Sequence, residues 1–365
     1  MSSRHQPGGN PEDGMNTDPQ LAVLSTLTEA NEPGAAELSE VLGDVVHLPP
    51  ASGPVEVERI KPRVYRMRLG TNGTRQAFVL KRLDPWLARR TELVARRWLP
   101  AFGLGDRCAG LVATAADRRG EWVWHVYEDL GDGAVDPGCP DSSRVAAVME
   151  LLAALHTRAA RHPLVPECRR YCGGLGAGYF VTSVRDAIAV LEELAPPRLD
   201  PTLEQRALRD GLLSRLSRLR EELPRRVRLL ENLGGPDTLL HGDPWPANTS
   251  VAANGHGPVA RLIGWEHAAV GPASYDVSTF LYRFPKCERP WILEAYRCAV
   301  TRADWYLPPA RDLNAMFETM EYARLANRVI WPAVALLEEQ APWGWRKLAE
   351  VESWFDTLES ALPEP

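Results

Sequence analysis

The chain has 365 residues, 45% hydrophobic and 25% charged, a length at which two lobes or domains are expected. No apolar run is long enough to span a bilayer, and residues 1–20 lack the apolar core of a secretory signal, so we expect a cytoplasmic protein. The net charge of −6 is uneven, because residues 1–60 carry −8 and the remaining chain +2. The dispersed arginines exclude an obvious nucleic-acid groove, so we expect no nucleic-acid or membrane partner, and the oligomeric state stays open.

The first third of the chain changes its pattern twice. Residues 1–20 are typical of a disordered leader, and residues 21–54 of two short helices followed by a linker rich in proline. A helix is expected over residues 88–101, and a hairpin turn at Gly70-Thr71-Asn72-Gly73. Strands are predicted at residues 55–60, 64–69, 76–83, 109–115 and 122–127.

Helical periodicity dominates after residue 130, where Asp141 or Ser142 can cap the first of several helices. Two short strands, at 238–240 and 259–263, flank a polar loop. Further helices are predicted at residues 181–195, 203–233, 274–284, 290–304, 309–340 and 345–361. The order predicts an α+β, bilobal protein, with a small antiparallel β-sheet lobe at 55–130 and a larger, mostly helical lobe at 131–361.

The polar loop His241-Gly242-Asp243-Pro244-Trp245-Pro246-Ala247-Asn248 carries the strongest chemical signal. Phosphoryl transfer needs a carboxylate that orients the attacking hydroxyl and accepts its proton, and oxygen ligands for Mg²⁺. Asp243 is the candidate base, and Asn248, five residues later, is a candidate metal ligand. The plain alternative is that both residues only cap turns, as Asp and Asn beside proline often do.

With this spacing, the His-Gly-Asp opening resembles the catalytic loop of aminoglycoside phosphotransferases and choline kinases. The resemblance runs from about residue 55 to 340, and includes residues 262–277, which are similar to a strand and turn of that family. It implies a protein-kinase-like fold and the ATP-dependent, Mg²⁺-dependent transfer of a γ-phosphate to a hydroxyl of a small molecule. That molecule would be an antibiotic, an amino alcohol or a biosynthetic intermediate. Asp276 resembles the family's structural acid and is expected to cap a helix that begins near Val277.

The same resemblance assigns nucleotide-binding roles in the first lobe. Lys81, one of only four lysines, ends an apolar strand and would hold phosphates, and Glu92 on the next helix would pair with it. The alternatives are an exposed lysine at a strand end and a glutamate on a solvated helix face. Glu128 and Leu130 match the hinge segment whose backbone would pair with adenine.

Two departures from the family pattern weaken the case for an enzyme. Gly264 stands where the family has a metal-binding aspartate, and the turn at residues 61–63 contains no glycine to approach phosphates closely. Glu266 could replace the missing metal ligand if its stretch of chain is extended, because it would then point the same way as residue 264. A catalytically impaired pseudokinase, or a kinase fold that has been repurposed for non-phosphoryl chemistry, is the alternative function.

Two further expectations concern the acceptor. The twelve tryptophans, Trp245 among them, are assigned mainly to packing rather than to a cage for a cationic ligand. The predicted second lobe is not conspicuously acidic, so a polycationic aminoglycoside is not the favoured substrate.

Overall fold

The structure, a computed structural model, describes residues 19–45, 55–71, 74–255 and 257–363. The leader predicted at 1–20 lies almost wholly outside these residues, as do most of the predicted linker and the tip of the first hairpin. The chain divides into two compact units, Met1–Arg89 with Gly110–Asp129, and Arg90–Ala109 with Leu130–Pro365. Residues 90–109, expected in the first lobe, therefore group with the helical unit, and the lobe limits of 55–130 and 131–361 stay a prediction.

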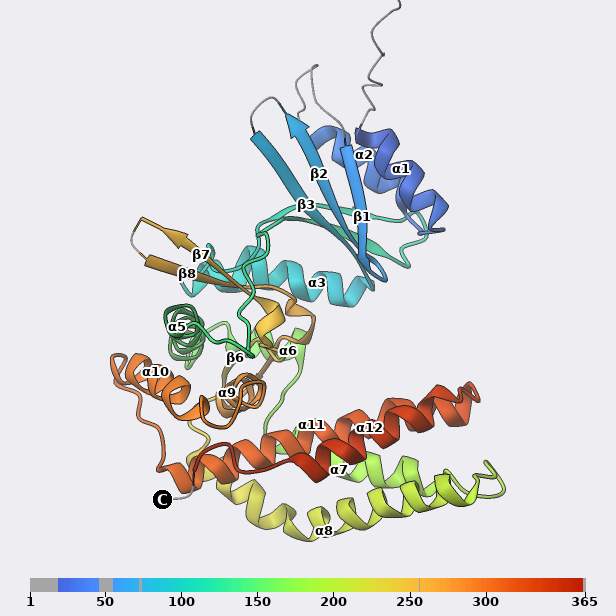
Figure 1. Cartoon of the computed structure of the whole chain (residues 1–365), viewed down its shortest axis with the longest axis vertical. Helices are drawn as coiled ribbons and strands as arrows, with labels where there is room; N and C mark the ends of the chain where they lie inside the picture. Colours follow the sequence, from blue (N-terminus) through green and yellow to red (C-terminus); the bar gives the residue numbers. More distant parts are fainter. Residues whose placement is uncertain (1–18, 46–54, 72–73, 256, 364–365) are drawn as a thin grey trace, which may run out of the picture. The chain divides into compact units, whose positions relative to one another are not determined.

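The first unit is built on an antiparallel five-stranded sheet with the strand order β1-β2-β3-β5-β4 (Figure 1). The five predicted strands are confirmed, with no end shifted by more than two residues. They are β1 (Val55–Lys61), β2 (Val64–Thr71), β3 (Thr74–Leu83), β4 (Leu111–Ala116) and β5 (Val123–Glu128).

The two predicted N-terminal helices, α1 (Pro19–Glu29) and α2 (Ala35–Val45), pack on this sheet within the first unit (Figure 1). Their apolar side chains share one buried cluster with Tyr65 and Trp124. Between the helices, Glu32 pairs with Arg82 at 3.1 Å. Four of the ten acidic residues in residues 1–60 lie on these two helices, which pack against the sheet.

The second unit is mostly helical, with two short strand pairs and two 3₁₀ turns around the loop at residues 241–248. Helix α3 (Pro85–Leu93) begins in the first unit, and from Arg90 onward it belongs to the second, where it continues through a π-helical turn (Val94–Trp98) into α4 (Leu99–Ala101). The others are α5 (Ser142–Ala159), α6 (Val165–Cys172), α7 (Ala177–Glu192), α8 (Leu203–Leu233), α9 (Ser274–Leu281), α10 (Arg289–Thr301), α11 (Ala310–Glu338) and α12 (Trp343–Thr357). The short elements are β6 (Thr238–Leu240), β7 (Thr249–Asn254), β8 (Gly257–Leu262) and β9 (Ala269–Gly271), with 3₁₀ turns at Pro246–Asn248 and Trp265–His267.

The prediction missed α6, β7 and β9. Helix α6 has the sequence VPECRRYC, and its eight residues are too few for helical periodicity to be recognised. Strand β7 contains two alanines, which have a low strand propensity, and β9 has only three residues. Both strands exist because a partner at another point of the chain completes their ladders, β8 for β7 and β6 for β9.

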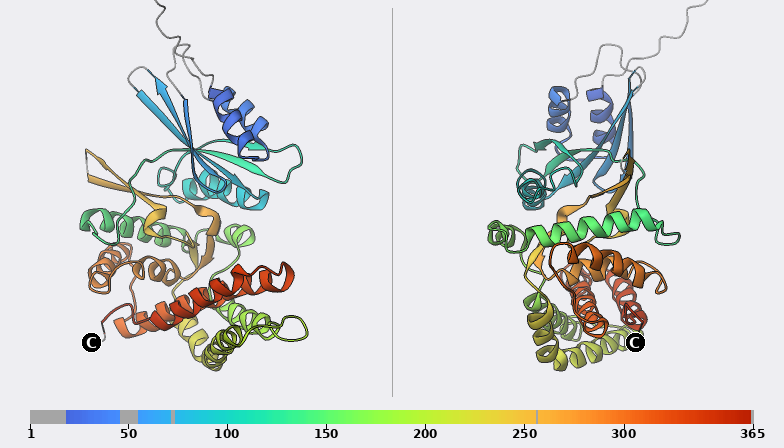
Figure 2. Two further views of the ribbon diagram at one scale, coloured as in Figure 1. Left: turned by 45° about the vertical axis from the view of Figure 1, so that its right-hand side comes forward. Right: turned by 90° about the vertical axis from the view of Figure 1, so that its left-hand side faces the viewer.

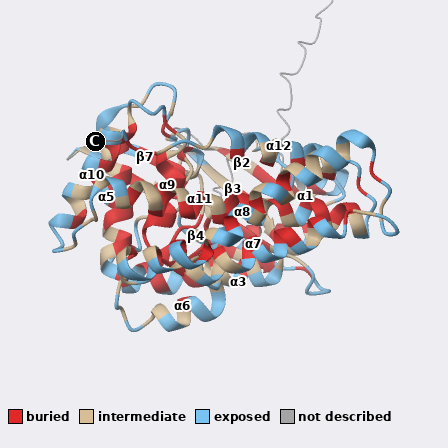
Figure 3. Ribbon diagram, turned by 90° about the horizontal axis from the view of Figure 1, so that it is seen from below, coloured by how far each residue is buried: buried red, intermediate tan, exposed pale blue. Residues whose placement is uncertain are grey.

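Two buried clusters organise the second unit. One joins α5 and α10 to the strands around the 241–248 loop, and the other joins α7, α8, α11 and α12, which run alongside one another (Figure 2). Helix α9 is buried over its whole length (Figure 3). None of the described helices combines the length and apolar composition that crossing a bilayer requires.

Candidate functional site

The loop at residues 241–248 leaves the buried strand β6 through a tight turn at Gly242. The backbone of Gly242 has a φ of +83°, and a Cβ atom at this position would overlap the carbonyl oxygen of His267. Only glycine meets both conditions. Asp243, which follows this turn, is partly exposed, and the loop ends with the 3₁₀ turn Pro246–Asn248.

Asp276 anchors this loop rather than capping a helix, which corrects the sequence expectation. Helix α9 already begins at Ser274, so Asp276 lies within its first turn. Its fully buried carboxylate accepts hydrogen bonds from the backbone N–H of His241 (2.7 Å) and of Gly242 (2.9 Å). His156 Nε2 lies 3.3 Å from the same carboxylate, and Tyr296 Oη lies 2.8 Å from His156 Nδ1. This buried network of polar side chains therefore holds the start of the loop in place.

The buried imidazole of His241 holds the loop in shape from the other side. Its Nε2–H donates to the carbonyl of Ile263 at 2.9 Å, and its Nδ1 accepts from the backbone N–H of Asp243 at 3.3 Å. Both bonds require the neutral ring with the proton on Nε2. Burial lowers the pKa of His241, although the carboxylate of Asp276 opposes this shift. The ring of Trp265 packs against it, with 4.6 Å between ring centroids.

The depressed pKa of His241 predicts a loss of stability at mildly acidic pH. Below about pH 6.5 the unfolded chain takes up a proton at this residue while the folded protein does not, so the free energy of unfolding falls as the pH falls. Above that pH the contribution is fully present. We expect the melting temperature to fall more steeply for the wild type than for His241→Gln between about pH 7.5 and 5.5. Parallel curves for the two proteins would contradict this assignment.

Asp243 and Asn248 meet as the sequence spacing requires. Asn248 Nδ2 donates to the backbone carbonyl of Asp243 at 2.8 Å and to its carboxylate Oδ2 at 3.2 Å. Because the amide nitrogen is committed to Asp243, the amide oxygen of Asn248 faces the other way, toward Gly264. The pair thus presents a carboxylate for a hydroxyl and an amide oxygen for a cation.

Gly264 and Glu266 lie beside that amide oxygen. Gly264 is left-handed, with a φ of +81°, and a Cβ built on it would lie 3.2 Å from Asn248 Oδ1 and 3.7 Å from Glu266 Oε2. The expected extended stretch is wrong, because residues 265–267 form a 3₁₀ turn. The turn nevertheless brings the Glu266 carboxylate near the position that the Cβ atom of an aspartate at residue 264 would occupy. Arg90 holds this turn by donating to the Glu266 carbonyl at 2.7 Å.

A hard cation is compatible with these oxygens. Mg²⁺ binds proteins through one or two oxygen ligands and keeps several waters, which matches one amide oxygen and one carboxylate. Within the described ranges, no group of three or more His, Cys, Asp or Glu side chains is arranged to hold a metal ion. The sequence-predicted ligands Asn248 and Glu266 are therefore brought together, but they form a sparse donor set.

The other predicted site residues belong to both units. In the first, Lys81 lies on β3 opposite Val64 and His125, and the side chain of Glu128, at the end of β5, accepts from the backbone N–H of Gly110 at 2.8 Å. In the second, the carbonyl of Leu130 accepts from Ser250 Oγ at 3.5 Å, and Glu92 pairs with Arg96 at 3.2 Å. The expected pairing of Lys81 with Glu92 would join the two units and stays a prediction.

Two arginines that lie beside the ring of Trp245 were not predicted from the sequence. The Arg283 guanidinium lies over the ring of Trp245, 3.7 Å from its centroid, and Arg328 lies 5.7 Å from the same centroid. Arg283 follows α9 and Arg328 lies on α11, so the three residues are far apart in sequence. No motif spacing signals such a cluster, because it arises from how the two helices pack.

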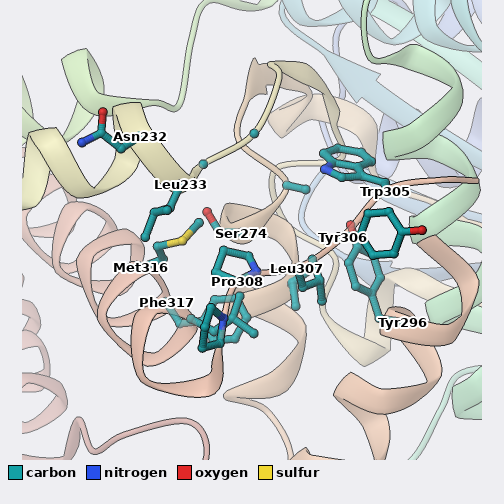
Figure 4. Close-up of a pocket in the computed structure, with 16 residues that line it drawn as sticks. Asn232, Leu233, Ser274, Tyr296, Trp305, Tyr306, Leu307, Pro308, Met316 and Phe317 are labelled. Carbon is teal, nitrogen blue, oxygen red and sulfur yellow. The ribbon is translucent and has the colours of Figure 1, made fainter. Parts of the chain in front are cut away.

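The second unit also contains an apolar cavity of about 330 Å³ (Figure 4). The rings of Tyr296, Trp305 and Tyr306 lie on one side of it, and Met316 and Phe317 on the other (Figure 4). No residue of the 241–248 loop lines this cavity, and neither does any charged side chain. Its walls offer no group for phosphoryl transfer.

Comparisons with known proteins agree with this geometry. An ethanolamine kinase of Plasmodium vivax has a TM-score of 0.56 at 12% identity, with 83% of this chain and 82% of that chain covered. The structure of APH(2″)-IIia in complex with GDP and kanamycin has a TM-score of 0.57 at 15% identity, covering 88% and 99%. A spectinomycin phosphotransferase in complex with ADP and spectinomycin has a TM-score of 0.51 at 8% identity, covering 84% and 90%.

These structures share the predicted protein-kinase-like fold with this chain, and at such identities they show the fold alone. No curated protein sequence matches the chain. The sequence model of the phosphotransferase enzyme family, which includes the aminoglycoside phosphotransferases, matches residues 60–306. That range holds the 241–248 loop, Asp276 and most of the sheet, so the resemblance inferred from the sequence is confirmed, and the chain belongs to the phosphotransferase enzyme family.

Proposed function

We propose that the protein is an ATP-dependent small-molecule kinase that uses Asp243 as its base. The observation that carries the proposal is the pair Asp243 and Asn248, held on one loop that is fixed from two sides by Asp276 and His241. Such a loop is preorganised, and phosphoryl transfer depends on positioning more than on covalent chemistry by the protein. In the reaction, the bond from the γ-phosphorus to the bridging oxygen breaks, and a bond to the acceptor oxygen forms. The acceptor's proton passes to Asp243, and ADP leaves.

The remaining roles follow from family membership and are part of the same proposal. Lys81 would hold the nucleotide phosphates, Glu92 would support it, and the hinge at Glu128 and Leu130 would receive the base. The GDP and ADP in two similar structures support a purine nucleotide as the donor. Asn248 and Glu266 would hold Mg²⁺, which when bound neutralises charge on the phosphates.

Gly264 supports a second candidate function, a pseudokinase that binds nucleotide without transferring phosphate. A metal site that lacks one carboxylate holds Mg²⁺ less tightly, because charge as well as geometry contributes to binding.

Nucleotide binding and ADP release separate the two candidates. The full chain is titrated with ATP in the presence of Mg²⁺, and hydroxylated acceptors are then screened for ADP release above the rate without acceptor. Binding together with acceptor-dependent release supports the kinase, and binding without release under any acceptor supports the pseudokinase. No binding at millimolar ATP would overturn both.

If Glu266 supplies the missing carboxylate, its replacement should change the metal requirement. We expect Glu266→Gln to raise the Mg²⁺ concentration for half-maximal ADP release by about tenfold, the effect of losing one ligand or its support. Gly264→Asp should lower that concentration, at a cost of about 1 kcal/mol in stability from the left-handed backbone. Glu338→Gln, an exposed glutamate at the end of α11, serves as the matched control. Equal Mg²⁺ dependence of Glu266→Gln and the control would remove Glu266 from the site.

A further inference from the structure

A cavity of about 140 Å³ in the second unit has four arginines among its eleven lining residues. No residue of the 241–248 loop lines this cavity, but its lining residue Arg283 lies over the ring of Trp245 and so connects the cavity to the loop that carries Asp243. The backbone N–H of Trp245 donates to the backbone carbonyl of Asp243 at 2.8 Å, so the main chain of the two residues is held in one turn. The charged lining residues are Arg283, Arg289, Glu321, Arg324, Arg328 and Glu359.

Two of the four arginines have a carboxylate partner and two do not. Arg324 forms a buried salt bridge with Glu321, and Arg289 lies 3.7 Å from Glu359, which also pairs with Lys286 at 3.1 Å. Among the described residues, no carboxylate lies within ion-pair distance of Arg283 or Arg328. The lining of the cavity therefore carries a net charge of +2 when all six groups are ionised.

Arg283 and Trp245 also keep polar groups buried without a partner. Within the part of the chain that the structure describes, Arg283 Nε and Trp245 Nε1 are buried and make no hydrogen bond. Such groups are rare in folded proteins, since each costs about 1–3 kcal/mol. A ligand that accepts hydrogen bonds here would remove that cost.

The cations are held in place before any ligand arrives. Arg283 lies 3.7 Å from the centroid of the Trp245 ring, and Arg328 lies 5.7 Å from that centroid and 4.9 Å from the centroid of the Trp354 ring. Glu321, Arg324 and Arg328 are spaced three and four residues apart on α11, which puts them on one face. Burial, with repulsion from Arg324 and Arg328, lowers the pKa of Arg283 to about 10, while Glu321 and Asp243 act in the opposite direction. The side chain thus stays charged at neutral pH.

From this cluster we infer that the phosphate acceptor is an anionic alcohol, whose carboxylate or phosphate group binds Arg283 and Arg328 while its hydroxyl faces Asp243. The inference rests on the proposed kinase function and names its substrate class. Planar guanidinium groups suit both oxyanions, because each presents paired N–H donors to two oxygens. A polycationic aminoglycoside would instead meet two unneutralised arginines and be repelled.

Binding of four small alcohols of different charge tests the inference without nucleotide. The full chain is titrated calorimetrically with ethanolamine, glycerol, glycerate and glycerol 3-phosphate at low ionic strength. We expect the two anions to bind, the neutral and cationic alcohols not to bind, and added salt to weaken the binding. The stronger of the two anions identifies the carboxylate or the phosphate as the preferred group.

Four variants locate the binding. Arg283→Met and Arg328→Met should each weaken anion binding by about tenfold, which corresponds to about 1.4 kcal/mol. Arg328→Lys should retain part of the affinity, because it keeps the charge. Arg311→Met, an exposed arginine in the first turn of α11, should bind as the wild type does.

Three outcomes of the binding measurements, and a fourth from a variant at Lys81, would overturn the inference. The first three are no saturable anion binding up to about 10 mM, equal affinities of Arg283→Met, Arg328→Met and Arg311→Met, and ethanolamine binding at least as tightly as the anions. Loss of anion binding in Lys81→Met with retention in both arginine variants would likewise overturn it, since the anion would then occupy the nucleotide site. ATP binding is measured separately. Loss of ATP binding would overturn the proposed kinase function but not the anion site, and loss of anion binding would overturn the anion site but not the kinase function.

Discussion

Replacing Asp243 by asparagine is expected to lower the turnover of acceptor phosphorylation by about 10²- to 10⁴-fold, the contribution of a positioned general base. The change removes the charge and the proton acceptor but keeps the shape of the side chain. The amide oxygen of the new asparagine can still accept from Asn248 Nδ2, which now donates to Asp243 Oδ2 at 3.2 Å. We therefore expect the KM for ATP and the melting temperature to change little.

Steady-state kinetics of ADP release, with ATP binding measured in parallel, checks this expectation. Asp237→Asn provides the matched control, because Asp237 lies just before β6 and forms only an exposed ion pair with Arg169. Such a pair contributes about 0–1 kcal/mol to stability and nothing to the chemistry. If Asp243→Asn and Asp237→Asn have equal turnover, Asp243 is not the base.

Replacing Asp276 by alanine is expected to lower the free energy of unfolding by about 3–5 kcal/mol, as removing one partner of a buried charged network typically does. The backbone N–H groups of His241 and Gly242 would lose their acceptors inside a site where water does not reach. Asp276→Asn should rescue little, because one oxygen becomes an NH₂ group that meets another donor. The loop would loosen, so turnover should fall together with stability.

Urea denaturation gives the stability change, and hydrogen exchange of residues 241 and 242 reports whether the loop opens locally. Asp186→Ala is the control, since Asp186 is exposed on α7 and its loss should change stability by no more than about 0.5 kcal/mol. Unchanged exchange at both amides in Asp276→Ala would show that another group anchors the loop.

The parts of the site that are close in sequence were predictable. Asp243 and Asn248 meet because a turn of five residues fixes their separation, whatever surrounds it. Period and turn chemistry also predicted the five strands of the sheet, the two N-terminal helices and α8, whose bounds of 203–233 are the predicted ones. Each of these features depends on interactions between neighbouring residues, which the sequence displays directly.

Residues far apart in sequence could not be placed in this way. The Asp276 carboxylate was expected at a helix end, but its partners are amides 34 and 35 residues earlier in the chain. Glu266 was expected to reach the metal site from an extended stretch, whereas a left-handed glycine and a 3₁₀ turn bring it near Asn248. Both outcomes depend on the packing of segments that lie far apart in the sequence, such as β6 and α9.

By itself, then, the sequence determined the α+β class, the order of the elements and the loop from His241 to Asn248, because local periodicity and spacing encode them. The tertiary structure alone decided what holds that loop and what lies beside it. Arg283, just after α9, and Arg328, on α11, both reach Trp245 because α9 and α11 pack against each other. The positive charge of the cavity comes from arginines that the packing of helices distant in sequence brings together. No single stretch of the sequence contains all of these arginines.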